Sequence, residues 1–278
     1  MNVPILAYHA YNIVGNDYFN NDHVAFAHDL ELITSQGWQI APLHEIIDVF
    51  LADRISLPKK TIAITFDDGT DFDFYDLLHP TAGMQRSMLN IMSDFAKSNP
   101  GAQPKLHATS FVIASPDARN AMAKKNIFGN NWMRDSWWLE AVDSGRLGIG
   151  NHSWDHVSNA VSYVAQRNQE KGNFFCIDTL SDAIAQIYVA AEFIESIAPN
   201  PSTKLFAYPY GHVNKYLPEV FLPNQAADRN GMVKAAFGTK DLPLMGDSDR
   251  WNIPRYVCGW HWKSQSELRA ILNQCEAG

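Results

Sequence analysis

The sequence TIAITFDDG, residues 61–69, joins a run of β-branched and apolar residues to two adjacent carboxylates and a glycine. Its first six residues predict a buried strand of a parallel sheet. Two neighbouring carboxylates at the end of such a strand repel each other unless a cation lies beside them. A divalent metal would relieve this repulsion, with one Asp as ligand and the other as base. The alternative is a solvent-exposed Asp-Asp-Gly turn, which this short motif alone would favour.

Short apolar runs alternate with segments of helical period along the whole chain, which indicates a parallel α/β fold. We expect strands at 3–8, 61–66, 108–114, 147–150, 204–208, 233–237 and 255–259, and helices at 24–36, 43–51, 85–97, 136–144, 179–197 and 264–274. Two stretches that carry Asn and Gly, 70–104 and 118–134, the first of them also with Pro, are interpreted as loops that extend from this scaffold. Long loops at the strand ends of a barrel usually shape the substrate site.

Length, charge and cysteine spacing limit the classes of protein to which the chain can belong. The chain has 278 residues, which suits one large domain over 1–278. A net charge of -8 argues against a nucleic-acid partner, and the absence of a long apolar run argues against a membrane span. The three cysteines are widely spaced and indicate neither a disulfide framework nor a zinc knuckle. Met1 to Pro4 lack the features of an export signal, so we expect a cytoplasmic protein, or a periplasmic or secreted one if a signal has been removed.

A second polar motif, His152-Ser153-Trp154-Asp155-His156, follows the expected strand at 147–150. Two histidines four residues apart lie on one face of a helical turn and can reach one metal, although this spacing is common by chance. With Asp68 they form a His-His-Asp set that leaves a coordination position open for water. These ligand types favour zinc, with cobalt, nickel and iron as alternatives.

A third motif, Phe206 to Gly211, also follows a strand. Its turn through Pro209 and Tyr210 holds backbone N–H groups in a fixed direction, which suits an oxyanion hole. An ordinary turn is the simpler reading of this segment.

Taken together, these segments resemble the polysaccharide deacetylases (carbohydrate esterase family four). Residues 65–69 match the family's TFDDG motif, 152–156 match its H-[ST]-x-x-H motif, and 206–211 are similar to its third motif. The Tyr8-His9 opening and residues 26–47 resemble the branch that acts on poly-N-acetylglucosamine-like polymers. The resemblance implies a distorted (β/α)7 barrel and a metal-dependent hydrolase that removes an N-acyl group, most commonly acetyl, from an amino sugar.

The resemblance also implies roles for individual residues. Asp67 would be the general base, and Asp68, His152 and His156 would hold the metal. The backbone N–H of Tyr210 would help to stabilise the oxyanion.

This chain departs from the family pattern in two motifs, and in each case we assign the expected role to a candidate residue. The third motif lacks the Arg that orients the base, and Arg255 is our candidate to reach Asp67 in its place. The family's last motif, Leu-x-His, keeps only its histidine, so we assign His261 as the acid that protonates the leaving amine. His9 is an alternative for this role, or for a substrate contact, because it also follows the end of an expected strand.

Tryptophans are abundant in the expected loops and strand ends, where flat rings can stack on sugars. Of these, Trp154 is our candidate for a substrate contact because it lies inside the histidine motif. Three alternatives stay open: a hydrolase of a non-sugar C–N amide, a glycan-binding relative that has lost catalysis, and a purely structural role. The sequence does not indicate the oligomeric state.

Overall fold

The computed structural model describes residues 2–52, 57–127, 129–228 and 232–277. Within them, seven strands follow one another in the order β10, β1, β3, β6, β7, β8 and β9, all in parallel pairs. Their bounds are β1 (Ile5–Tyr8), β3 (Thr61–Asp68), β6 (Ala108–Val112), β7 (Leu147–Asn151), β8 (Leu205–Ala207), β9 (Ala235–Phe237) and β10 (Tyr256–Val257). β2 (Gln39–Ile40) pairs with β3 alongside this path.

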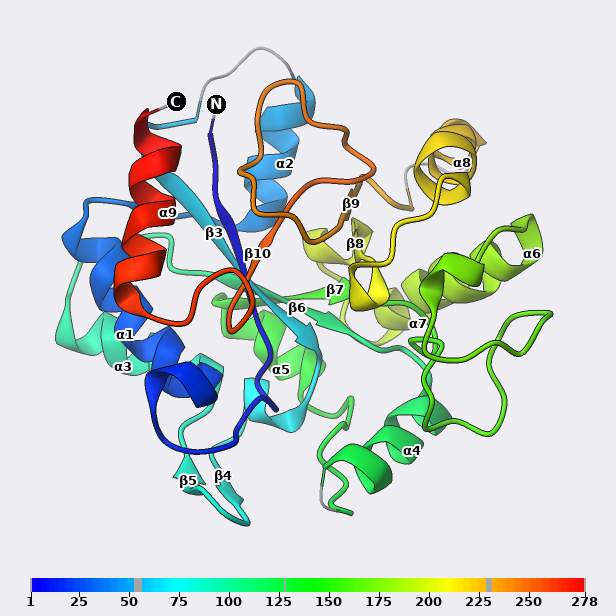
Figure 1. The fold of residues 1–278 in the computed structure, drawn as a ribbon, viewed down its shortest axis with the longest axis horizontal. Helices are drawn as coiled ribbons and strands as arrows, with labels where there is room; N and C mark the ends of the chain where they lie inside the picture. Colours follow the sequence, from blue (N-terminus) through cyan, green and yellow to red (C-terminus); the bar gives the residue numbers. More distant parts are fainter. Residues whose placement is uncertain (1, 53–56, 128, 229–231, 278) are drawn as a thin grey trace.

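The sheet curls into a barrel (Figure 1). Phe237 at the end of β9 forms a parallel bridge with Ile253, which lies just before β10, and β10 pairs with β1. The two ends of the strand order are therefore brought together. This arrangement confirms the expected distorted (β/α)7 barrel.

Helices surround the sheet (Figure 1). They are α1 (Asp22–Ser35), α2 (Leu43–Ala52), α3 (Met88–Ser98), α4 (Pro116–Asn126), α5 (Trp138–Asp143), α6 (Leu180–Ala183), α7 (Val189–Ile197), α8 (Leu222–Asp228) and α9 (Gln265–Ala277). α1 packs against both α3 and α9. A small antiparallel hairpin, β4 (Leu77–His79) with β5 (Gly83–Gln85), projects beside them. None of the described helices is long and apolar enough to cross a membrane.

Side chains along β3 alternate between the two faces of the sheet, and this alternation decides on which face the charged Asp67 lies. Ile62, Ile64 and Phe66 belong to the large hydrophobic cluster that includes residues of the surrounding helices. Residues one position away point to the other face, as in any strand. Ala63 accordingly packs in a second cluster with Phe111 and Phe237, and Asp67 shares its face.

Two expectations for the helices need correction. The expected loop at 118–134 contains most of α4, whose polar sequence hides its helical period; its start is set by Pro116 and by the Ser115 side chain, which accepts a hydrogen bond from the Ala118 N–H. The expected single helix over 179–197 is interrupted by a π-helical segment, Ile184–Tyr188. Such π segments often occur at functional sites.

Candidate active site

Three candidate metal ligands meet at the carboxyl-terminal ends of β3 and β7. The Nε2 atoms of His152 and His156 lie 3.7 Å and 3.4 Å from Asp68 Oδ1. One ligand atom from each residue lies within 4.8 Å of the others, and all three side chains are buried. Parallel strands place their carboxyl ends at one edge of a barrel, which is why residues so distant in sequence converge here.

The backbone of Asp68 turns its carboxylate toward the histidines. Asp68 has a φ of 74° and Gly69 a φ of 68°, so both lie in the left-handed region. Non-glycine residues adopt this conformation rarely, and it is concentrated at functional sites. A Cβ on Gly69 would lie 2.5 Å from Val112 Cγ1, so no larger residue fits. Because the strand geometry breaks at Asp68, the Asp67 carboxylate can contact Arg255 while the Asp68 carboxylate lies beside the two histidines.

The histidine motif does not form the helical turn that its spacing suggested. Ser153 and His156 have φ values of 72° and 60°, and residues 152–156 form an irregular turn. Both rings nevertheless reach Asp68, with centroids 4.9 Å apart. The expected convergence is therefore present, but its assumed cause was wrong.

These residues fit a divalent cation. His152 Nδ1 lies 2.9 Å from the Ala207 carbonyl oxygen, which would fix the tautomer with Nε2 free to bind a metal. Burial lowers the pKa of His156 to about 3, so its imidazole is neutral at physiological pH. One carboxylate and two imidazoles form the donor set typical of catalytic zinc.

Asp67 is held by a buried guanidinium. Arg255 donates to both carboxylate oxygens of Asp67, with distances of 2.7 Å and 2.8 Å, and also to Thr65 Oγ1 at 3.1 Å. Arg255 is fully buried and lies over the Phe111 ring. Burial alone would raise the pKa of Asp67, but the charge and hydrogen bonds of Arg255, together with the charges of His152 and His9, outweigh burial and hold that pKa well below its ordinary value. The structure thus places Arg255 where the sequence required a substitute arginine.

The third motif forms a short turn, Pro209–Gly211, beside the histidines. Tyr210 has a φ of 59° and its ring lies edge-on against His156, with centroids 4.3 Å apart. Gly211 is also left-handed, and a Cβ there would lie 2.0 Å from Thr239 Oγ1. The turn therefore has a fixed backbone direction next to the candidate metal ligands.

A cavity of about 180 Å³ joins these parts. Its walls include His9, Asp67, Asp68, both histidines of the motif, Tyr210 and Trp260. His261 is absent from the described residues that line it. Its Nδ1 accepts the Val257 N–H at 2.7 Å, and its ring stacks against Trp260 with centroids 4.8 Å apart. The geometry therefore favours His9 over His261 as the proton donor.

Aromatic side chains stand around the mouth of this cavity. Trp260 is 65% exposed, and Tyr11 and Tyr210 are each about two-fifths exposed at 43% and 41%. Trp154 is not among them, because its ring packs edge-on against Phe193 in the hydrophobic cluster. Trp260 therefore lines the cavity and Trp154 does not, while a substrate contact through Trp154 stays a prediction. Sequence reasoning also missed Tyr11, although its place two residues after the strand-end His9 was a usable signal.

The loop that carries His156 is anchored by Asp155. Its carboxylate accepts the N–H groups of Val157 and Ala165 at 2.8 Å and 2.6 Å, and the Gln186 side chain at 2.7 Å. Gln186 lies in the π-helical segment, and its carbonyl accepts the Trp154 N–H at 2.8 Å. The irregular helix thus supports the turn that carries the two histidines.

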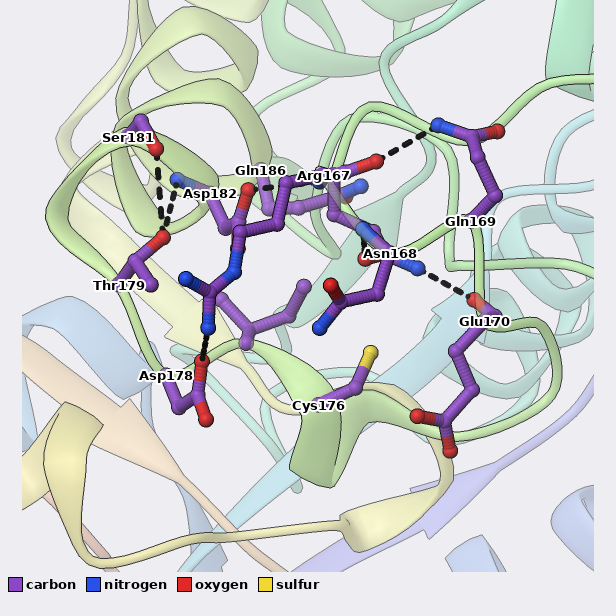
Figure 2. A network of polar contacts seen from close by, with 12 residues as sticks. Arg167, Asn168, Gln169, Glu170, Cys176, Asp178, Thr179, Ser181, Asp182 and Gln186 are labelled. Carbon is purple, nitrogen blue, oxygen red and sulfur yellow. Dashed lines mark hydrogen bonds and ion pairs between the residues drawn. The ribbon is translucent and has the colours of Figure 1, made fainter.

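The same loop is tied down further along its length (Figure 2). The buried Asp182 carboxylate accepts the Arg167 backbone N–H at 3.0 Å, and the Arg167 side chain donates to Asp178 at 3.2 Å. The Thr179 hydroxyl accepts the Asp182 N–H at the start of α6. These contacts fasten residues 165–186 together, so the histidine turn rests on an ordered base.

Known proteins resemble the chain in both sequence and fold. The family model described as Polysaccharide deacetylase matches residues 54–222. IcaB from Ammonifex degensii is 20% identical with a TM-score of 0.60, over 98% of this chain and 97% of that one. A de-N-acetylase from Aggregatibacter actinomycetemcomitans is 14% identical, also with a TM-score of 0.60, over 98% and 100%.

A polysaccharide deacetylase from Bacillus cereus is 17% identical with a TM-score of 0.60, over 98% of this chain and 69% of its own. No curated protein matches the chain in sequence. Identities this low show a shared fold alone, whereas the family model covers more than half of the chain. The chain therefore belongs to the polysaccharide deacetylase family, as its motifs indicated, and is a hydrolase of the C–N amide bond of N-acylated carbohydrates.

Proposed function

We propose that the protein removes N-acetyl groups from an amino-sugar oligomer or polymer with one zinc ion held by Asp68, His152 and His156. The observation that carries this proposal is the meeting of these three ligands beside an Asp67 that Arg255 keeps ionised. When bound, the ion supplies Lewis acidity, which polarises a carbonyl oxygen and makes water more acidic. Cobalt, nickel and iron are the alternatives for the same ligands.

Asp67 is the proposed acceptor of the proton from the attacking water. Its carboxylate is ionised because of Arg255, and the two-point contact fixes its orientation. A base held in one orientation needs no rearrangement as the water attacks.

Tyr210 and His9 complete the proposed reaction. The N–H of Tyr210, in the rigid turn after Pro209, would donate to the oxygen that gains negative charge. His9 would then give a proton to the nitrogen of the departing amino sugar. Its backbone N–H donates to the buried Asp22 at 2.8 Å, which holds the residue at the cavity wall.

An amino sugar suits this site better than a small non-sugar amide. Trp260, Tyr11 and Tyr210 present aromatic rings at the mouth, and such rings pack against the apolar faces of pyranoses. A glycan-binding relative without catalysis would have no need of a buried Asp67–Arg255 pair. The single domain and the cytoplasmic, periplasmic or secreted location stay predictions.

Acetate release tests this function directly. The zinc-loaded protein is given N-acetylglucosamine oligomers in one series and small formamides and cyclic ureides in another. We expect turnover of the oligomers, with loss of both bound zinc and turnover in His152→Ala. Turnover of the small amides alone would overturn the sugar assignment, and full turnover by metal-free His152→Ala would overturn the metal site.

A further inference from the structure

A second and larger chamber, of about 360 Å³, adjoins the catalytic cavity. Tyr11, Asp68, His156 and Tyr210 line both spaces, so the two meet at the candidate metal ligands. The catalytic cavity, at about 180 Å³, has half this volume and already has room for an acetyl group. The larger chamber is therefore available to another part of the substrate.

One wall of this chamber is apolar and rigidly held. Met122, Ile127 and Met133 line it and are 8%, 4% and 3% exposed. The buried Arg119 of α4 donates to the Met133 carbonyl oxygen at 2.9 Å and to Asp135 at 2.6 Å. This brace ties α4 to the segment that carries Met133. The wall is thus formed before any ligand arrives.

The chamber also contains a polar group that needs a partner. Thr70 lines it, is only 1% exposed, and its hydroxyl has no hydrogen-bond partner among the described residues. Buried polar atoms in native proteins are nearly always paired, and those that are not call for an explanation. A ligand group that hydrogen-bonds to the Thr70 hydroxyl would provide one.

We propose that this chamber binds the acetamido group of the sugar unit next to the one that is hydrolysed. The inference rests on the proposed function and deepens it. An acetamido group offers a methyl for the Met122, Ile127 and Met133 wall and polar atoms for the Thr70 hydroxyl. A plain hydroxyl offers no methyl group for this wall, and a long alkyl chain offers no polar atom for the Thr70 hydroxyl. The enzyme would therefore select runs of N-acetylated units over isolated ones.

Binding to the Asp67→Asn variant tests the chamber without requiring catalysis. Two neutral disaccharides are compared by calorimetry: one with two N-acetylglucosamine units, and one with a hydroxyl in place of the second acetamido group. Burial of one methyl group and formation of one hydrogen bond predict roughly 30-fold tighter binding of the first. The same ratio is then measured as kcat/KM with the zinc-loaded wild type.

Two substitutions locate the effect. Thr70→Val keeps the side-chain shape, and because the hydroxyl has no protein partner, the variant should be as stable as the wild type. We expect the ratio to fall roughly five- to tenfold in Thr70→Val and similarly in Met133→Gln. Met84→Gln, at a methionine 66% exposed on β5, is the matched control and should keep the wild-type ratio.

Equal binding of both disaccharides, or an unchanged ratio in Thr70→Val and Met133→Gln, would overturn the inference. Acceptance of N-butanoyl as readily as N-acetyl at the reacting unit, with a ratio near one, would show that the chamber holds the reacting acyl group instead. Absence of turnover with the binding ratio intact would overturn the proposed function and leave the chamber assignment standing.

Discussion

Replacement of Arg255 by Met is the perturbation that most sharply tests how the base is held. Arg255 is buried, and its guanidinium makes two contacts to Asp67 at 2.7 Å and 2.8 Å. Removing one member of a buried ion pair leaves the other charge uncompensated, at a cost of about 3–5 kcal/mol. Domains of ordinary stability unfold at about 5–15 kcal/mol, so the variant should fold but be markedly weakened.

A double-mutant cycle separates the ion pair from simple packing. Urea unfolding would be measured for wild type, Arg255→Met, Asp67→Asn and the double variant, all with metal chelated. Because each single substitution leaves one buried group without its partner, the double variant should be more stable than the sum of the two losses predicts, by roughly 2 kcal/mol or more. Arg86→Met, at an arginine half exposed on the surface, should change stability by less than about 1 kcal/mol. Additive losses across the cycle would refute the account of a buried pair.

Three further outcomes follow from the structure. Burial lowers the pKa of His107 from 6.5 to about 4, so its neutral form stabilises the fold above pH 6.5. This stability is lost as the pH falls, by about 2 kcal/mol at pH 5. The His107→Gln variant should therefore show a flatter pH dependence of its unfolding free energy, and an unchanged slope would contradict this prediction. His9→Gln should lower kcat about 100-fold or more and His261→Gln less than tenfold; the reverse order in steady-state assays would restore His261 as the acid. Asp155→Asn should weaken zinc binding about 10- to 100-fold because the His156 turn loses its anchor; calorimetric titration that finds wild-type affinity would rule this out.

The sequence predicted the scaffold and the ligand set because both depend on simple patterns. The apolar residues at 61–66 mark a buried strand, and carboxyl ends of parallel strands meet at one edge. Asp68, His152 and His156 therefore had to approach one another. Arg255 was predicted from the family resemblance, because the family's third motif usually carries an Arg that orients the base and this chain's third motif does not.

Local backbone geometry was not predictable in the same way. The turn at 152–156 depends on left-handed residues and on the distant Gln186, which no spacing rule describes. His261 does not line the cavity, and its Nδ1 accepts the N–H of Val257, a residue of the two-residue strand β10. Trp154 and Trp260 look equivalent in sequence, but Trp154 is partly buried against Phe193 whereas Trp260 is exposed. In each of these cases the deciding contact is one that residue spacing does not reveal.

The most direct test of the account is a crystal of the protein soaked in zinc and measured at the zinc absorption edge. We predict one strong anomalous peak between Asp68, His152 and His156, at about 2.0–2.2 Å from a carboxylate oxygen and both Nε2 atoms. A peak bound by other residues, or no peak at these three side chains at saturating zinc, would contradict the proposed metal centre.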